Sequence, residues 1–375
     1  MSIVPLLSVD GGGIRGIIPS RILEYVETRM GVPVQSRFYM SAGASAGGQI
    51  VTATSLVNGK PILTAGETKN LFVVEGPEIF RKGFLSRTFN IDLPNLFTTK
   101  YDGKHLDHVL RRVFGDLKLS DLDNDLLVSS YDIVRRKEKL FKSWDARGNF
   151  TDPSDRAQGT DPRSKDYSLF DVARATSSAQ SYFNVYTAHN MLGEPSHLID
   201  GGNFANNPAL MLYADAVRRY GDTHQYVVLS LGSGETERPL DVHALRNAGI
   251  IRWASPTVHI NLGSMRSHDY IMRTLLERDY IRMQTDLRRQ SPDKPGPSDD
   301  FDDASKENIA RLEERAEELL KAERHRLDCF VEFLMANKLK TQDELADEHE
   351  HCERSSPRPK PACDPSTLPE PEGTI

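Results

Sequence analysis

The chain has 375 residues, 38% of them hydrophobic, and its 47 basic and 54 acidic side chains give a net charge of −7 at pH 7. This length allows one large domain or two ordinary ones with a core that needs no disulfide bonds, and the composition is that of a soluble globular protein. The acidic balance argues against a protein that binds nucleic acid, because such domains are normally basic.

The sequence carries no strong targeting or redox signal. Its three cysteines, Cys329, Cys352 and Cys363, have neither the number of a disulfide framework nor the spacing of a metal site. The N-terminus lacks the basic segment and long apolar stretch of a signal peptide, and no window approaches the roughly 20 apolar residues of a membrane helix. We therefore expect a cytoplasmic protein without a metal ion or other cofactor, and transient contact with a membrane surface remains open.

The first 290 residues alternate between short apolar segments and segments with helical spacing. Residues 3–9 predict a buried strand, in which Pro5 is tolerated because it lies near the start. Residues 14–30 repeat apolar side chains at the spacing of a helix. Further strands are predicted at residues 126–130, 140–144, 197–199 and 226–231. This alternation predicts a three-layer α/β/α sandwich with a mostly parallel central sheet over residues 1–290.

The composition changes after residue 290. Residues 291–304 are rich in Pro, Asp and Ser, which predicts a linker. Residues 305–340 place apolar side chains along one stripe, which predicts an amphipathic helix that packs on the domain or, alternatively, on a partner. Residues 341–375 are acidic and Pro-rich, so we expect them to be largely disordered. The net charge is +3 for the predicted domain and −10 for the remainder, so the domain itself is compatible with an anionic lipid surface.

A glycine-rich segment, residues 10–16 (DGGGIRG), connects the first predicted strand to the first predicted helix. Glycines let a backbone approach a ligand closely, and a helix N-terminus presents unpaired N–H groups to an anion. The spacing also satisfies the dinucleotide pattern G-x-G-x-x-G, which expects an acidic residue at the end of the next strand. Residues 32–40 contain no acidic residue, and the Gly-Lys-Ser/Thr of a phosphate-binding loop is absent as well.

A second motif, Gly-Ala-Ser-Ala-Gly at residues 43–47, fits the G-x-S-x-G pattern of a nucleophile elbow. In such an elbow, Gly43 and Gly47 would permit the sharp strand-to-helix turn that exposes the hydroxyl of Ser45. Small residues around a serine also occur by chance in turns. A serine hydroxyl is a poor nucleophile until a base takes its proton, so the motif needs a partner.

A third motif, Asp-Gly-Gly at residues 200–202, directly follows a short predicted strand. Alone, such a motif is more often only a turn. The three motifs together, in this order, resemble the patatin-like phospholipase family. Residues 126–146 and 174–183 also resemble that family, and the resemblance extends over residues 3–232.

The resemblance implies a role for each motif. It implies a Ser-Asp dyad in which Ser45 is the nucleophile and Asp200 the base, without the histidine of the usual triad. Gly201 and Gly202 belong to the proton-acceptor motif. The resemblance also implies an oxyanion hole in the glycine-rich segment. Its N–H groups would come from Gly11, Gly12 and Gly13, and Arg15 would be the nearby cation.

The function that the resemblance implies is that of a lipid acyl hydrolase, a phospholipase of the A type that cleaves carboxylic esters of phospholipids through an acyl-serine intermediate. No metal is implied. Three alternatives remain open: a general esterase or triacylglycerol lipase with the same site, a phospholipase effector regulated by cyclic nucleotides, and an interaction protein that uses the C-terminal helix.

The histidines and an aromatic, basic segment also bear on function. We expect the histidines of the predicted domain to be ordinary side chains whose replacement leaves hydrolysis intact: His105, His108, His189 and His197. Residues 79–97 mix aromatic and basic side chains, which suits docking on lipid headgroups. Packing of this segment against the core is the favoured interpretation, because most amphipathic helices cover a core.

Overall fold

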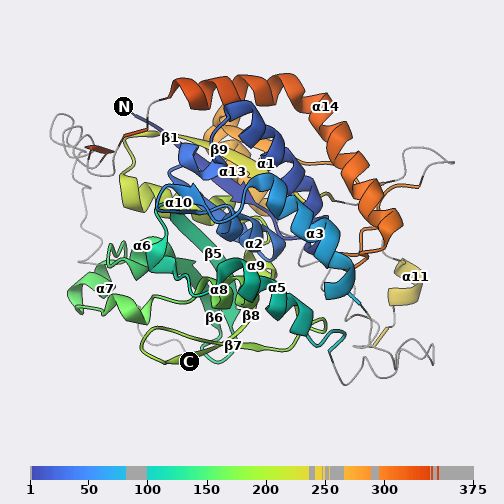
Figure 1. The fold of residues 1–375 in the computed structure, drawn as a ribbon, viewed down its shortest axis with the longest axis horizontal. Coiled ribbons are helices and arrows are strands. Elements are labelled where there is room, and N and C mark those ends of the chain that lie inside the picture. The colour runs from blue at the N-terminus through green and yellow to red at the C-terminus, as the bar shows by residue number, and fades with distance from the viewer. Residues whose placement is uncertain are drawn as a thin grey trace.

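The computed structural model describes residues 2–81, 99–235, 241–246, 248–249, 253, 266–288, 295–337, 339–340 and 344–345. Within these residues an eight-stranded sheet forms the centre of the molecule (Figure 1). Its strands are β1 (Ile3–Val9), β2 (Met40–Ala44), β5 (Asp125–Asp132), β6 (Lys137–Lys142), β7 (Tyr186–His189), β8 (Pro195–Asp200), β9 (Gln225–Leu231) and β10 (Tyr280–Met283). A separate hairpin joins β3 (Leu56–Val57) to β4 (Lys60–Pro61).

Strands β10, β9, β1, β2 and β5 run parallel in this order. Strands β6 and β8 are antiparallel to β5, and β7 is antiparallel to β8. The pairing of β6 with β5 overlaps that of both β2 and β8, so β6 takes one edge of β5. Strands β2 and β8 consequently share the opposite edge and approach each other from opposite directions.

Helices cover both faces of the sheet, which confirms the predicted three-layer sandwich. In β1, Leu7 and Val9 contribute to the core under one helix layer, whereas Val4 and Leu6 contribute to the core under the other. The first layer contains α1 (Ile17–Met30), α2 (Ala46–Ala53), α3 (Ala65–Ile79), α5 (Lys104–Phe114), α8 (Leu169–Thr176) and α14 (Lys306–Ala336). The second contains α10 (Ala209–Tyr220) and α13 (Arg266–Leu276). Short helices complete the fold: α6 (Ser143–Ala146), α7 (Pro153–Ala157), α9 (Gly202–Ala205) and α11 (Val242–Leu245).

The C-terminal helix α14 packs on the domain along α1 (Figure 1). Ser305 caps its start by accepting a hydrogen bond from the backbone N–H of Asn308. Its apolar side chains join the same core as those of α1, and Leu312 is fully buried there. Polar contacts flank this core, since the Tyr25 hydroxyl donates to Asp328 at 2.6 Å. The helix therefore forms part of the first helix layer.

Residues 295–304, part of the segment predicted as a linker, also contact the domain. The carbonyl oxygen of Phe301 accepts the backbone N–H of Ile14 at 2.9 Å. Asp302 accepts the Tyr101 hydroxyl at 2.6 Å and pairs with Lys100. These contacts connect the segment to the glycine-rich loop and to the loop before α5.

Several predicted features lie outside the described residues. These are residues 82–97 of the aromatic and basic segment, together with most of the acidic C-terminal tail. In the part of the chain that the structure describes, no helix is long and apolar enough to span a membrane. The same residues contain no cluster of His, Cys, Asp and Glu side chains suited to a metal ion.

Candidate active site

The pairing of the strands brings the three sequence motifs together. The parallel pairing of β1 with β2 places the glycine-rich segment beside the serine turn. Two neighbouring residues of β5 pair with the ends of these strands. Ser129 pairs with Ala44 at the end of β2, and Ser130 pairs with Asp200 at the end of β8. Because β2 and β8 meet on this edge from opposite directions, Ser45 and Asp200 face each other across their strand ends.

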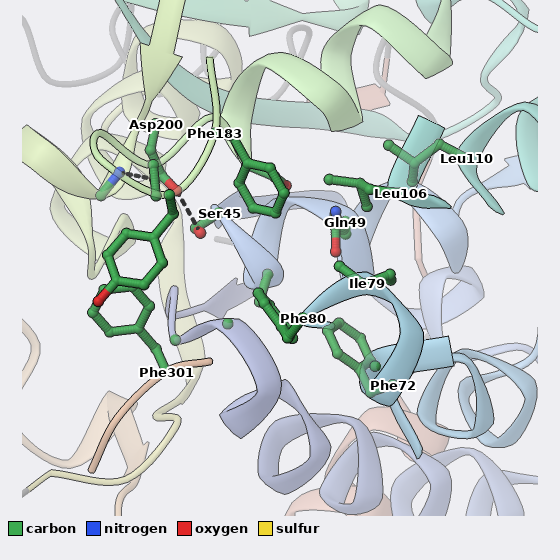
Figure 2. A pocket seen from close by; sticks show the side chains of 18 of the residues that line it. Ser45, Gln49, Phe72, Ile79, Phe80, Leu106, Leu110, Phe183, Asp200 and Phe301 are labelled. Atoms are coloured by element: carbon green, nitrogen blue, oxygen red, sulfur yellow. Dashed lines mark hydrogen bonds between the residues drawn. The ribbon is translucent and has the colours of Figure 1, made fainter. Parts of the chain in front are cut away.

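Ser45 occupies the sharp turn between β2 and α2 (Figure 2). Its backbone angles, φ 52° and ψ −126°, lie in a region that favours glycine and cost a non-glycine residue about 1–3 kcal/mol. The flanking glycines are required sterically, because a Cβ on Gly43 would lie 2.3 Å from the Gly47 oxygen and one on Gly47 would lie 2.1 Å from the Val9 oxygen. The Ser45 N–H donates to the Thr176 hydroxyl at 2.8 Å, which holds the turn.

The Ser45 hydroxyl donates to Oδ2 of Asp200 at 2.7 Å (Figure 2). The other carboxylate oxygen, Oδ1, accepts the Gly202 N–H at 2.7 Å. Burial raises the pKa of Asp200 to about 6, although both hydrogen bonds act to lower it. A Cβ on Gly201 would lie 2.2 Å from the Ser129 carbonyl oxygen of β5. Only glycine fits this close approach of the two backbones. The pair therefore joins the hydroxyl of a partly buried serine to a buried carboxylate that is mainly ionised at neutral pH.

The N–H groups of the glycine-rich segment differ in their hydrogen bonding. The Gly11 N–H donates to the Asn206 carbonyl oxygen at 3.0 Å. This N–H is therefore already engaged within the fold, and the assignment of Gly11 to an oxyanion hole stays a prediction. Among the described residues, no hydrogen bond uses the N–H of Gly12 or Gly13, and both glycines line the cavity beside Ser45. These two groups remain available to an anion.

The rest of the segment packs closely against its surroundings. Gly13 has φ +55°, and a Cβ there would lie 2.1 Å from the Phe301 carbonyl oxygen. Arg15 is half-buried and also lines the cavity, with Nε 3.4 Å from the Gly12 oxygen and Nη1 3.5 Å from the Gly234 oxygen. Its guanidinium thus lies beside the glycine-rich segment and lines the cavity, as expected for the nearby cation.

A buried ion pair between Asp10 and Arg282 holds the start of the glycine-rich segment. Asp10 accepts two hydrogen bonds from Arg282 of β10, at 2.9 and 2.6 Å, and each side chain is 6% exposed. Arg282 also donates to the Ser230 hydroxyl of β9 at 2.9 Å. Bidentate pairs of this kind restrict orientation as well as distance. The start of the glycine-rich segment is thereby anchored to two strands.

An apolar cavity of about 130 Å³ opens beside Ser45. It extends between α3 and α5 and is lined there by apolar side chains that include Phe72, Ile79, Leu106 and Leu110 (Figure 2). Near the dyad its lining includes Tyr182 and Phe301, whose ring centroids lie 4.6 Å apart. The arrangement suits an acyl chain whose ester carbonyl lies at the serine.

In the described part of the chain, no histidine forms a hydrogen bond with Ser45 or Asp200. His105 contacts Glu75 at 2.9 Å, and Nδ1 of His197 contacts the Thr187 hydroxyl at 3.0 Å. The carboxylate of Asp200 is therefore the group in hydrogen-bonding contact with the serine hydroxyl.

Sequence reasoning assigned no role to four residues that shape this site: Thr176, Asn206, Arg282 and Phe301. Each acts through a contact with a segment remote in sequence, and none belongs to a motif with a predicted role. Asn206 lies four residues after the Asp-Gly-Gly motif, which is the nearest to a signal that the sequence offers.

The sequence comparisons with known proteins agree with these motifs. The sequence profile described as "Patatin-like phospholipase" matches residues 7–213. Patatin-like protein 2 of Arabidopsis thaliana is 28% identical over 358 residues, covering 85% of this chain and 83% of that protein. Patatin group J-1 of Solanum tuberosum is 28% identical over 347 residues, covering 85% and 84%. The solved structure of VipD from Legionella pneumophila aligns with a TM-score of 0.35 and 12% identity, covering 85% of this chain and 67% of that one.

The profile match includes the glycine-rich segment, the serine turn and Asp200, and it extends over more than half of the chain. The two plant relatives extend the similarity into the C-terminal part. The sheet, the helix layers and the meeting of the three motifs agree with this match. The chain belongs to the patatin-like phospholipase family.

Proposed function

We propose that this protein is a phospholipase of the A type that hydrolyses the carboxylic ester bonds of phospholipids through an acyl-Ser45 intermediate. Membership of the family already identifies a lipid acyl hydrolase. The observation that carries the finer proposal is the 2.7 Å hydrogen bond from the Ser45 hydroxyl to the buried Asp200 carboxylate, at the mouth of an apolar cavity. A hydroxyl in contact with a base and an apolar channel that can hold an acyl chain both serve acyl transfer from a lipid.

In the proposed reaction, Asp200 accepts the hydroxyl proton while Oγ of Ser45 attacks the ester carbonyl carbon. The N–H groups of Gly12 and Gly13 donate to the oxygen of the tetrahedral intermediate, where negative charge develops. Asp200 then returns the proton to the leaving alcohol. Asp200 next takes a proton from water, whose oxygen attacks the acyl carbon. The bond to Oγ of Ser45 then breaks, the fatty acid leaves, and Asp200 returns the proton to Oγ.

A general esterase or a triacylglycerol lipase would use the same dyad, so product analysis has to separate these activities. We expect the protein to release free fatty acid and a lysophospholipid from mixed phospholipid vesicles, and to act more slowly on emulsified triacylglycerol. Mass spectrometry of the products, with Ser45→Ala as the blank, measures both. Release from triacylglycerol alone, or equal release by Ser45→Ala, would contradict the proposal.

The pH dependence of hydrolysis follows from the raised pKa of Asp200. Only the ionised carboxylate can accept the serine proton, and burial raises its pKa to about 6. We therefore expect kcat/KM to be constant above about pH 7 and to fall about tenfold per unit below pH 6. A pH-stat assay with a short-chain ester measures this profile. An inflection near pH 4, the usual range of an aspartate, would contradict a buried base.

A further inference from the structure

Gln49 places a polar amide inside the apolar cavity. It lies one turn after Ser45 on α2, and its backbone N–H donates to the Ser45 carbonyl oxygen at 3.0 Å. Residues four apart occupy the same helix face, so Ser45, Gln49 and Ala53 line the cavity in a row. Figure 2 shows the amide between Ile79 and Leu106, pointing into the space that an acyl chain would fill.

The side-chain amide of Gln49 has no hydrogen-bond partner among the described residues. The cavity-lining side chains around it are hydrocarbon and include Ile79, Leu106 and Leu110. In the empty cavity the amide can be solvated, because the residue is only partly buried. A plain alkyl chain would remove that solvent and leave two donors and an acceptor unpaired. Burying an unpaired polar group carries a substantial free-energy cost.

From this placement we infer that Gln49 selects acyl chains that carry a hydrogen-bonding oxygen, a keto or hydroxyl group, within the chain and several carbons from the ester carbonyl. The inference rests on the proposed function and adds a substrate class to it. The amide can donate to a keto oxygen, and it can both donate to and accept from a hydroxyl. Such a chain replaces the lost solvent contact, whereas an alkyl chain does not.

The position of the oxygen follows from the helix. Gln49 is displaced from Ser45 by one turn of α2, about 5.4 Å along the axis. The ester carbonyl is placed at Ser45, so the partner oxygen lies several carbons from the carbonyl and not at the chain terminus. A polar group in a binding site discriminates best against the analogue that lacks its partner.

The test uses p-nitrophenyl decanoate and a set of isomeric oxodecanoates in which one keto group is moved along the chain. For the full-length protein we expect kcat/KM to be at least about tenfold higher for the best oxo isomer than for decanoate. Gln49→Leu keeps the side-chain size and helix propensity but removes the amide, so it should lose this preference and hydrolyse decanoate faster than the wild type. Spontaneous hydrolysis is subtracted with Ser45→Ala.

Two further variants make the result decisive. Gln158→Leu, a matched change at an exposed position after α7, should retain the wild-type preference. Gln49→Met repeats the test with a second apolar side chain, and thermal unfolding establishes that each variant is folded. Equal kcat/KM of the wild type for all isomers, or an unchanged preference in Gln49→Leu, would overturn the inference while leaving the hydrolase proposal intact. If the wild type hydrolysed none of these esters faster than Ser45→Ala does, the proposed function itself would be contradicted.

Discussion

Replacing Ser45 by alanine is expected to lower kcat for ester hydrolysis by about 10⁴-fold or more, because no covalent intermediate can form without the nucleophile. The effect on stability should be small or favourable. The hydroxyl's contact with Asp200 is lost, but Asp200 can take up a proton and keep its bond from the Gly202 N–H. Steady-state kinetics with a p-nitrophenyl ester and thermal unfolding measure the two effects.

The matched control for this change is Ser154→Ala, at an exposed position in α7. It should leave kcat and the unfolding temperature unchanged. A Ser45→Ala protein that is folded and retains a tenth or more of the wild-type kcat would show that another residue attacks the ester.

Replacing Asp200 by asparagine is expected to lower kcat/KM about 10³-fold while preserving the geometry of the turn. The amide oxygen of asparagine can still accept the Gly202 N–H, but the amide group facing Ser45 cannot accept a proton. Burial raises the pKa of Asp200, so the charged carboxylate destabilises the folded state above about pH 6, and this cost disappears with a neutral side chain. We therefore expect an unchanged or higher unfolding temperature at pH 7, together with the loss of activity.

Two kinds of control define this result. Asp116→Asn, at an exposed position after α5, makes the same chemical change away from the cavity and should be fully active. Replacing His105 or His197 by glutamine should leave kcat/KM within about threefold, which is the scatter expected of changes outside the reacting groups. A histidine variant as impaired as Asp200→Asn would contradict the assignment of the base.

The sequence predicted strands β1 and β9 well because both are strongly apolar, whereas β2, with the sequence MSAGA, has no comparable apolar run. Strand β1 matches its predicted bounds, and β9 begins one residue earlier than predicted. The short strands β7 and β10, with sequences YTAH and YIRM, were not predicted, because four residues of mixed polarity carry no periodic signal. Their place in the sheet depends on pairing with β8 and β9, which is a tertiary property.

The start of the first helix was predicted too early for a physical reason. Residues 14–16 share the apolar spacing of the helix, but the structure forms a 3-10 turn over Gly13–Gly16 before α1 begins at Ile17. The tight turn lets the chain change direction after β1 while Ile14 donates its N–H to Phe301. Hydrophobic periodicity cannot distinguish these two helical forms over four residues.

The candidate dyad could be named from motifs, but its geometry could not. The strand before Asp200 is evident from sequence, whereas its direction along β5 is not. Only the antiparallel pairing that aligns Asp200 with Ser130 brings the carboxylate to the serine. The engagement of the Gly11 N–H has a similar origin, since it donates to the carbonyl of Asn206, which is far away in sequence. Contacts between distant backbone groups have no local sequence signature.

The unpaired amide of Gln49 could not be predicted from the sequence either. On the sequence it is simply one polar residue in the helix after the serine motif. Its significance depends on α3 and α5, which surround it with hydrocarbon. The substrate class is thus argued from packing, whereas the reaction class follows from the motifs.

Covalent labelling with an alkyl fluorophosphonate measures whether Asp200 activates Ser45 as the nucleophile. We expect a single adduct, located by fragmentation mass spectrometry on Ser45. It should form more than a hundredfold more slowly in Asp200→Asn, and more slowly below pH 6 in the wild type. An adduct on a different residue, or equal labelling rates for the wild type and Asp200→Asn, would contradict this activation of Ser45.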